Sequence, residues 1–282
     1  MLPHLWFKPA SRFRSTIKAV LSILSFSPSA RPCVASQAPC PSTFHKEAHV
    51  TRIPYKTALI IGAGVGISAS LTRMLSDAGL KVALAARDTA KLEALTAQTG
   101  ARAFAADAAD PASMASLFSQ VDEAIGEPEI VIYNASARAH GPIAEIDPEM
   151  FRKSLSITAF GGFLAAQQAA RRMVPKGSGA IFFTGASASV KGFPLSSAFA
   201  TGKFGLRGLA QSVARELGPK GVHVAHFVID GAVESERRVT PADSPDSFLS
   251  PDAIAQTYID VLSQARSAWS LEVELRPWVE KF

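Results

Sequence analysis

Short apolar runs alternate along the chain with longer segments whose apolar residues recur at helical spacing. Several of the short runs, such as 58–61, 130–132 and 181–183, are continuously apolar, which is typical of strands buried on both faces of a parallel sheet. The alternation predicts a doubly wound parallel sheet of Rossmann type, an α/β three-layer sandwich with right-handed crossovers. The predicted strands are 57–61, 81–86, 102–105, 130–133, 180–184, 222–229 and 271–275, and the predicted helices lie near 67–78, 89–98, 111–125, 148–173, 197–217 and 251–265.

The first 50 residues have a different composition, rich in Ser, Pro and Arg, and residues 1–46 contain no acidic residue. Residues 12–26 are compatible with a basic amphipathic helix of the kind used for organelle import, and residues 19–26 with the apolar part of a secretory signal. We therefore expect a targeting or disordered leader over 1–50, with a mitochondrial or other organellar location, or otherwise a cytoplasmic one. A single nucleotide-binding domain is predicted over 51–282.

Charge and cysteine content exclude several classes of protein. The formal net charge is +5, but residues 47–282 carry 23 basic and 24 acidic residues, so the domain lacks the basic excess that nucleic-acid binding requires. Both cysteines, Cys33 and Cys40, lie in the leader, which excludes a disulfide scaffold or a cysteine nucleophile in the domain. No metal site is predicted, and no apolar run reaches the roughly 18–20 residues of a membrane span.

A glycine-rich turn directly follows the first predicted strand, in the sequence Gly62-Ala-Gly64-Val-Gly66-Ile67-Ser68. Glycines at a strand-to-helix junction allow a sharp turn and let backbone N–H groups approach a pyrophosphate at the helix N-terminus. Gly62, Gly64, Gly66 and Ile67 are therefore predicted to contact a dinucleotide. The competing interpretation is a tight turn that packs the helix on the sheet without a ligand.

The spacing of Gly62 and Gly66, with Ser68 in the place of a third glycine, resembles the short-chain dehydrogenase/reductase family. Further landmarks in the same order extend this resemblance over about residues 56–235. The resemblance implies a doubly wound domain, a nicotinamide dinucleotide cofactor, a small-molecule substrate and oxidoreductase chemistry.

The resemblance also implies cofactor contacts further along the chain. Where members that prefer NAD carry an acid at the end of the second strand, this chain has Ala86 followed by Arg87, which favours the 2′-phosphate of NADP, with NAD as the alternative. Asp107 stands where the family places an acid beside the adenine, and Asn134-Ala-Ser resembles the family's Asn-Ala-Gly. Ser235 keeps the hydroxyl that the family places beside the nicotinamide carboxamide.

The catalytic residues of the family are mostly replaced. Aligned on the retained Lys203, the tyrosine position is Phe199, the serine position is Ala186, and the helix asparagine corresponds to Thr158. A tyrosine there would exchange a proton with the substrate oxygen while hydride moves at carbon, and phenylalanine has no proton to give. Lys203 holds the nicotinamide ribose in the family, so its retention argues for cofactor binding.

Three residues are candidates to replace the lost groups. Ser187 lies one position from the expected serine, with Ser189 as a weaker candidate, and His140 lies in the loop after the fourth strand, where an imidazole can supply a proton near neutral pH. Each is otherwise an ordinary polar loop residue.

Three hypotheses on function remain. The first is an NADP-dependent oxidoreductase with a non-standard active site, the second a catalytically inactive NADP-binding protein with a regulatory or oligomeric role, and the third a lyase or isomerase on the same scaffold. The small residues of the predicted helices 148–173 and 197–217 would allow close helix packing, and the resemblance implies a homodimer or homotetramer through them. Residues 234–252 form a short polar segment where the family has its substrate lid.

Overall fold

A seven-stranded parallel sheet forms the centre of the computed structural model, which describes residues 53–236 and 238–280; the predicted leader lies outside these residues. The strand order β3-β2-β1-β4-β5-β6-β7 confirms the doubly wound topology. Every pairing between neighbours is parallel, and the buried strands β1 and β4 lie at the centre with Ile61 opposite both Ala85 of β2 and Tyr133 of β4. The strands are β1 (Thr57–Ile61), β2 (Lys81–Ala86), β3 (Arg102–Ala105), β4 (Ile130–Tyr133), β5 (Gly179–Thr184), β6 (Val222–Ile229) and β7 (Glu272–Leu275).

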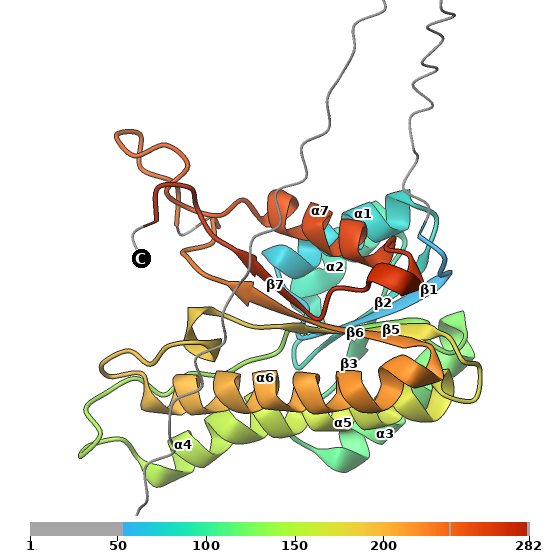
Figure 1. Ribbon diagram of the computed structural model, residues 1–282, viewed down its shortest axis with the longest axis horizontal. Helices are drawn as coiled ribbons and strands as arrows, with labels where there is room; N and C mark the ends of the chain where they lie inside the picture. The colour runs from blue at the N-terminus through green and yellow to red at the C-terminus, as the bar shows by residue number, and fades with distance from the viewer. Residues whose placement is uncertain (1–52, 237, 281–282) are drawn as a thin grey trace, which may run out of the picture. The chain divides into compact units, whose positions relative to one another are not determined.

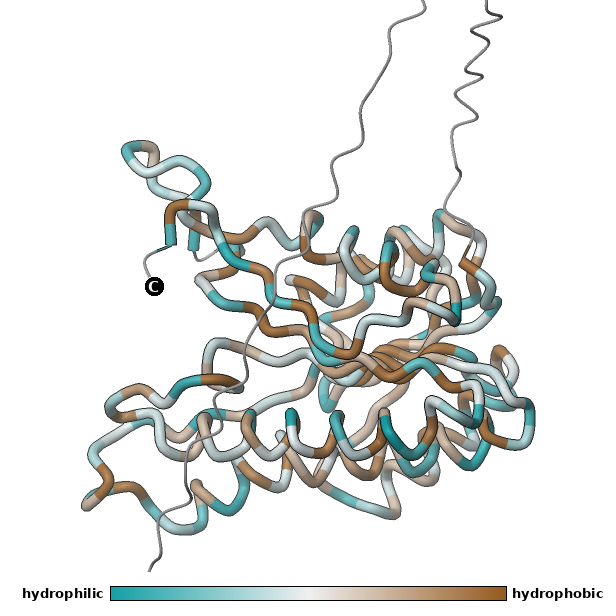
Figure 2. The backbone as a smooth tube through the Cα atoms, viewed as in Figure 1, coloured by the Kyte–Doolittle hydropathy of each residue, from teal (hydrophilic) through white to brown (hydrophobic). Residues whose placement is uncertain are grey.

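Helices cover both faces of the sheet and make a three-layer sandwich (Figure 1). One face carries α1 (Ile67–Asp77), α2 (Glu93–Thr99) and α7 (Pro251–Leu262), and the other carries α3 (Pro111–Ile125), α4 (Pro148–Leu155), α5 (Gly161–Met173) and α6 (Ser197–Leu217). Two separate apolar clusters fill the spaces between the layers. Figure 2 shows the same arrangement as hydrophobic strands in the middle and helices of mixed character outside.

Three helices begin with the same local device, a polar capping residue followed by proline. Asp110 accepts hydrogen bonds from the backbone N–H groups of Ala112 and Ser113 at the start of α3, and Asp147 and Ser250 accept equivalent bonds at α4 and α7. The cap satisfies a backbone donor that has no partner inside the helix, and proline needs none. These signals explain why the predicted starts at 111, 148 and 251 are confirmed.

The predicted helix 148–173 is interrupted in the structure. Residues Ser156–Phe160 form a π-helical turn between α4 and α5. Such turns insert one extra residue into a helix and keep a helical backbone on both sides, and the prediction of one continuous helix missed this one. The turn carries Thr158, which is fully buried and faces the loop after β4.

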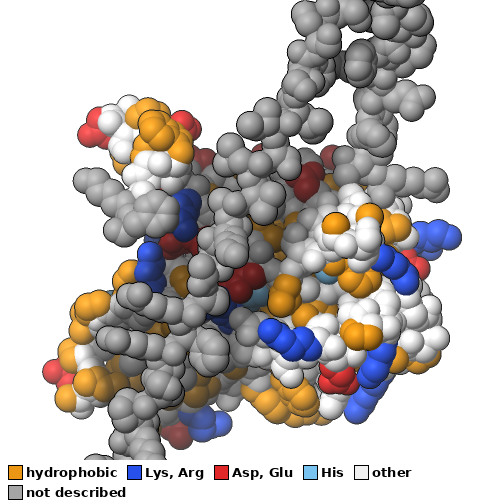
Figure 3. Space-filling model, viewed as in Figure 1, with side chains coloured by type: hydrophobic (Ala, Val, Ile, Leu, Met, Phe, Trp, Pro, Cys, Tyr) orange, Lys and Arg blue, Asp and Glu red, His pale blue; other side chains and the backbone are white. Residues whose placement is uncertain are grey.

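No helix among residues 53–236 and 238–280 is long and apolar enough to cross a membrane. On the face drawn in Figure 3, the basic, acidic and hydrophobic side chains of the described residues are intermixed.

Candidate functional site

The glycine-rich turn lies at the carboxyl end of β1, at the point where the strand order reverses between β1 and β4. Gly62 has a φ of +85°, and a Cβ there would stand 2.4 Å from the backbone nitrogen of Ala135. The backbone N–H groups of Gly62 and Ala63 both donate to the carbonyl of Ala85, at 2.9 and 3.0 Å. Gly62 is therefore required by the fold itself, because the segment after β4 passes directly over it.

Gly64 and Gly66 serve a different purpose from Gly62. A Cβ at either position would meet no protein atom within 4 Å. The turn is held shut by Ser68, whose hydroxyl oxygen accepts a hydrogen bond from the N–H of Gly64 at 2.8 Å and lies 3.1 Å from its carbonyl. Open space above glycines at the start of α1 fits a pyrophosphate, which needs close approach of the backbone at a helix N-terminus.

A cleft of about 430 Å³ joins this turn to several of the predicted cofactor residues. Asn134 is positioned by its side-chain amide, which donates to the carbonyl of Gly62 at 3.1 Å. Asp107 is held by Ser113, whose hydroxyl oxygen accepts from its N–H, and its carboxylate accepts from the N–H of Ala109. The structure therefore brings together Gly62, Gly64, Arg87, Asp107 and Asn134, which all line this cleft.

The Arg87 end of the cleft carries the charge expected for a 2′-phosphate. Arg87 is exposed at the end of β2 and forms no ion pair or hydrogen bond with other described residues. Its neighbour Lys91 also lines the cleft and pairs with Asp88 at 3.0 Å, which lowers the pKa of the Asp88 carboxyl. Lys91 thus has its counterion within the protein, whereas Arg87 has none among the described residues.

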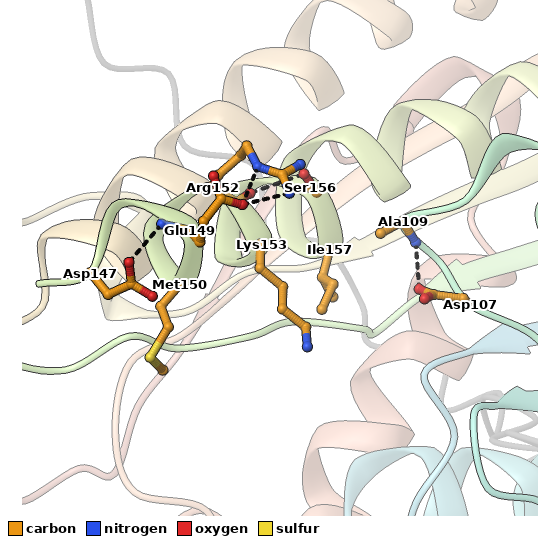
Figure 4. Close-up of a pocket in the computed structure, with 9 residues that line it drawn as sticks. All are labelled: Asp107, Ala109, Asp147, Glu149, Met150, Arg152, Lys153, Ser156 and Ile157. Carbon is orange, nitrogen blue, oxygen red and sulfur yellow. Dashed lines mark hydrogen bonds and ion pairs between the residues drawn. The ribbon is translucent and has the colours of Figure 1, made fainter.

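A second hollow of about 320 Å³ adjoins the cleft, since Asp107 and Ile157 line both. Helix α4 forms its other wall, where Arg152 and Glu149 pair with each other at 2.7 Å. Figure 4 shows the Lys153 side chain extending away from that ion pair. This hollow widens the end of the cleft at which Asp107 is expected to contact an adenine.

Ser235 lies close to the glycine-rich turn although it is far away in sequence. It lines a shallow hollow together with Val65 and Glu234, and its backbone exchanges two 2.9 Å hydrogen bonds with Arg238. The backbone after β6 is therefore folded back toward the turn.

Lys203 is buried on α6 with 3% of its surface exposed. Its Nζ donates a 2.6 Å hydrogen bond to the carbonyl of Thr184 at the end of β5. Burial, with a smaller contribution from the positive charge of Arg138, lowers the pKa of Lys203 to about 7. A group with such a pKa is present in both its protonated and its neutral form near neutral pH.

Phe199 lies one helical turn before Lys203, and its ring is contacted by two cations. The guanidinium carbon of Arg138 stands 4.3 Å from the ring centroid, and Nζ of Lys203 stands 5.8 Å from it. A guanidinium over an aromatic face is stabilised by about 0.5–2 kcal/mol. The ring therefore acts as a platform for Arg138, a residue that sequence analysis did not single out. Nothing in its loop pattern distinguishes it, because only the fold brings it to α6.

The other predicted catalytic residues lie in the short turn after β5 and in the loop after β4. Ser187 is half-buried in a short 3-10 turn (Ser187–Ser189), whereas Ser189 is fully buried and its hydroxyl oxygen accepts from the N–H of Ala186 at 3.2 Å. His140 is exposed, and the next residue, Gly141, donates its N–H to the carbonyl of Leu195. That bond ties the His140 loop to the segment that precedes α6, so His140 remains a candidate.

No group of three or more His, Cys, Asp or Glu side chains within residues 53–236 and 238–280 is arranged to hold a metal ion. The fold and the cleft define a doubly wound dinucleotide-binding domain with its site at the switch point of the sheet.

Comparison with known proteins agrees with this class. The short chain dehydrogenase family matches residues 56–241. D-threitol dehydrogenase of Mycolicibacterium smegmatis is 31% identical over 61% of this chain and 68% of its own length. A short-chain dehydrogenase structure from Rhodopseudomonas palustris is 36% identical, covers 79% of this chain and 99% of its own, and superimposes with a TM-score of 0.68.

A metagenomic short-chain oxidoreductase solved in complex with NADP is 26% identical, covers 79% of this chain and 98% of its own, and has a TM-score of 0.69. Taken with the strand order and the cleft, these matches establish that this chain belongs to the short-chain dehydrogenase family.

Proposed function

We propose that this chain is an NADP-dependent oxidoreductase that reduces a small carbonyl-like substrate and has Phe199 in the place of the family's active-site tyrosine. The observation that carries the proposal is the buried Lys203, whose ammonium lies beside the Phe199 ring at the carboxyl edge of the sheet. The nicotinamide cofactor, held by the cleft of Gly62, Arg87, Asp107 and Asn134, supplies the hydride when bound.

Lys203 supplies the proton in this proposal. Its pKa of about 7 places it between donor and acceptor states at neutral pH. Phe199 fills the volume of a tyrosine ring but leaves the position of the hydroxyl open, and a water molecule there would connect the ammonium to the substrate oxygen. Ser187 is proposed to hold that oxygen, and His140 is the alternative donor.

The family resemblance and the exposed aromatic residues support a homodimer or homotetramer. Phe160, Phe163 and Phe204 are all between 41% and 45% exposed on the outer side of the α5 and α6 layer. Ala165, Ala166 and Ala169, by contrast, are buried within the chain's own core. The proposed interface therefore uses the aromatic side chains, and the small residues serve packing inside the subunit.

Arg87→Ala is expected to raise the Kd for NADPH at least tenfold and to leave the Kd for NADH within twofold. The reason is that a charge-assisted hydrogen bond to a phosphate contributes about 1.5–3 kcal/mol. Fluorescence titration of the full chain with each cofactor measures both constants. Equal losses for the two cofactors would show that Arg87 does not contact the 2′-phosphate.

Phe199→Tyr combined with Ala186→Ser is expected to raise the rate of carbonyl reduction about 100-fold, because a positioned acid contributes 10²–10⁴ in rate. NADPH oxidation is followed by absorbance with a panel of ketones, imines and enones, for wild type and for the double variant. Turnover of a panel member by wild type supports the oxidoreductase. NADPH binding by both proteins with oxidation by neither would contradict it and support the inactive cofactor-binding protein.

A further inference from the structure

Arg138 is a cation without a counterion beside the reaction site. Among the described residues it forms no ion pair and no hydrogen bond, and its only assigned contact is the face of Phe199 at 4.3 Å. Its charge also reaches Lys203, since it contributes to the lowered pKa of that ammonium. Two positive groups thus face one aromatic ring, and an anion bound beside them would lower their mutual repulsion.

Two acidic residues that follow β6 have partners of their own. Asp230, with 5% of its surface exposed at the end of β6, pairs with Lys191 at 3.4 Å. Glu234 accepts a hydrogen bond from the Thr240 hydroxyl. The positive charge of Arg138 and Lys203 is therefore not balanced by these carboxylates.

The loop that carries Arg138 is anchored on both sides of it. The N–H of Ala137 donates to the hydroxyl of Thr158 at 3.2 Å, and its carbonyl accepts from the hydroxyl of Ser154 at 2.8 Å. Ala139, on the other side, is 3% exposed. An exposed arginine whose two neighbours are fixed and whose side chain lies on a ring is pre-organised, which reduces the entropy lost when it binds a ligand.

We propose that Arg138 is the anion-binding group of the active site and that the substrate carries a carboxylate close to its reacting carbon. The planar guanidinium presents a pair of N–H donors that match the two oxygens of a carboxylate, and its stacking on Phe199 fixes the direction of that pair. This assigns a role to the aromatic ring at position 199 that requires no hydroxyl. The inference rests on the proposed function in placing the reaction beside Phe199.

The test compares 2-oxo-4-phenylbutanoate with its ethyl ester, two ketones that differ in the carboxylate charge. Binding of each to the full chain saturated with NADP⁺, which cannot reduce a ketone, is measured by isothermal titration calorimetry, and turnover is measured separately by NADPH oxidation. Wild type is expected to bind the acid at least tenfold more tightly than the ester. Arg138→Ala is expected to remove this preference without changing the affinity for the ester by more than twofold, and Arg138→Lys to retain part of it.

Two further variants test whether binding of the acid depends on the position of the positive charge and on the aromatic ring. Arg215→Ala removes the same charge from an exposed position near the C-terminus of α6 and is expected to change nothing. Phe199→Leu removes the platform and is expected to weaken binding of the acid several-fold. Replacing the acid with phenyl phosphate distinguishes a carboxylate site from a general oxyanion site, and tighter Arg138-dependent binding of the phosphate would overturn the carboxylate assignment.

The outcomes distinguish the two proposals. Arg138-dependent binding of the acid without NADPH oxidation would contradict the oxidoreductase and leave the anion site standing. Turnover of the ester with no preference for the acid, or a preference that survives Arg138→Ala, would overturn the anion site and leave the oxidoreductase standing.

Discussion

Gly62→Ala is expected to destabilise the domain by about 3 kcal/mol or more, which places it among the most damaging single substitutions. The added Cβ would stand 2.4 Å from the backbone nitrogen of Ala135 and 2.5 Å from its Cα, so the segment after β4 would have to move. The φ of +85° adds a further cost for any residue with a side chain. Urea unfolding followed by circular dichroism measures the loss as a lower midpoint.

Gly66→Ala is the matched control, with the opposite profile. Its Cβ would meet no protein atom within 4 Å, so the free energy of unfolding is expected to stay within about 1 kcal/mol of wild type and the urea midpoint to change little. The same Cβ would stand at the start of α1, where the pyrophosphate approaches, and the Kd for NADPH is expected to rise at least tenfold. Unchanged NADPH affinity in Gly66→Ala, or an unchanged midpoint in Gly62→Ala, would refute this division of roles within the turn.

The strands and the sheet topology were predictable because a parallel sheet leaves a strong signal. Strands buried on both faces, such as 130–133, must be continuously apolar, and glycine, proline and capping residues mark the helix ends. The glycine-rich turn was predictable for the same reason, since its residue types are dictated by backbone geometry. The sequence shows that Ser68 departs from the family pattern by replacing the third glycine. Its hydrogen bonds to Gly64 could be found only from the structure.

The centre of the candidate site was less accessible from sequence. Arg138 and Phe199 are 61 positions apart, and their contact depends on how the loop after β4 is fixed by Thr158 and Ser154. The π-helical turn that presents Thr158 was not predicted from the sequence. Long-range contacts between a loop and a helix are set by tertiary packing, so no local pattern reports them.

The predicted cofactor-binding residues fell between these extremes. Asp107, Asn134 and Arg87 follow three different strands, and carboxyl ends of parallel strands meet at one edge of a sheet, which made their convergence predictable. His140 and Ser187 follow strands as well, but their side chains form no hydrogen bond with other described residues. Their catalytic roles stay predictions.

Lys203→Met is expected to lower kcat at least 100-fold while raising the Kd for NADPH less than tenfold. In the proposed reaction the ammonium provides the proton, whereas Gly66 and Arg87 are proposed to carry most of the cofactor binding. The donor is the protonated form, so kcat/KM of wild type is expected to fall as pH rises above about 7, where Lys203 loses its proton. Lys203→Arg retains the charge and is expected to keep part of the cofactor affinity.

His140→Ala is the control for the alternative donor and is expected to leave both kcat and the pH profile unchanged. Loss of turnover in His140→Ala, together with near-normal turnover in Lys203→Met, would transfer the donor role to the histidine. Rates are measured by NADPH oxidation, and cofactor binding by fluorescence, so loss of the cofactor is not mistaken for loss of the acid.

Lys203→Met should also reveal the energetic cost of burying the Lys203 ammonium. The folded state lowers the pKa of Lys203 from its usual 10.5 to about 7, so between these values the unfolded chain binds the additional proton. The free energy of unfolding therefore rises with pH between about 7 and 10.5. Below pH 7 the folded state bears the full cost of burying the charged ammonium. Lys203→Met removes the penalty but leaves the Thr184 carbonyl without its 2.6 Å partner, at a cost of about 1–3 kcal/mol.

Relative to wild type, Lys203→Met is accordingly expected to be most stable near pH 6 and to become less stable than wild type near pH 10. Urea unfolding at both values measures the change, and a difference independent of pH would show that Lys203 keeps its ordinary pKa in the fold. A stabilised variant that has lost turnover would mean that the domain retains a costly buried charge because the reaction uses it.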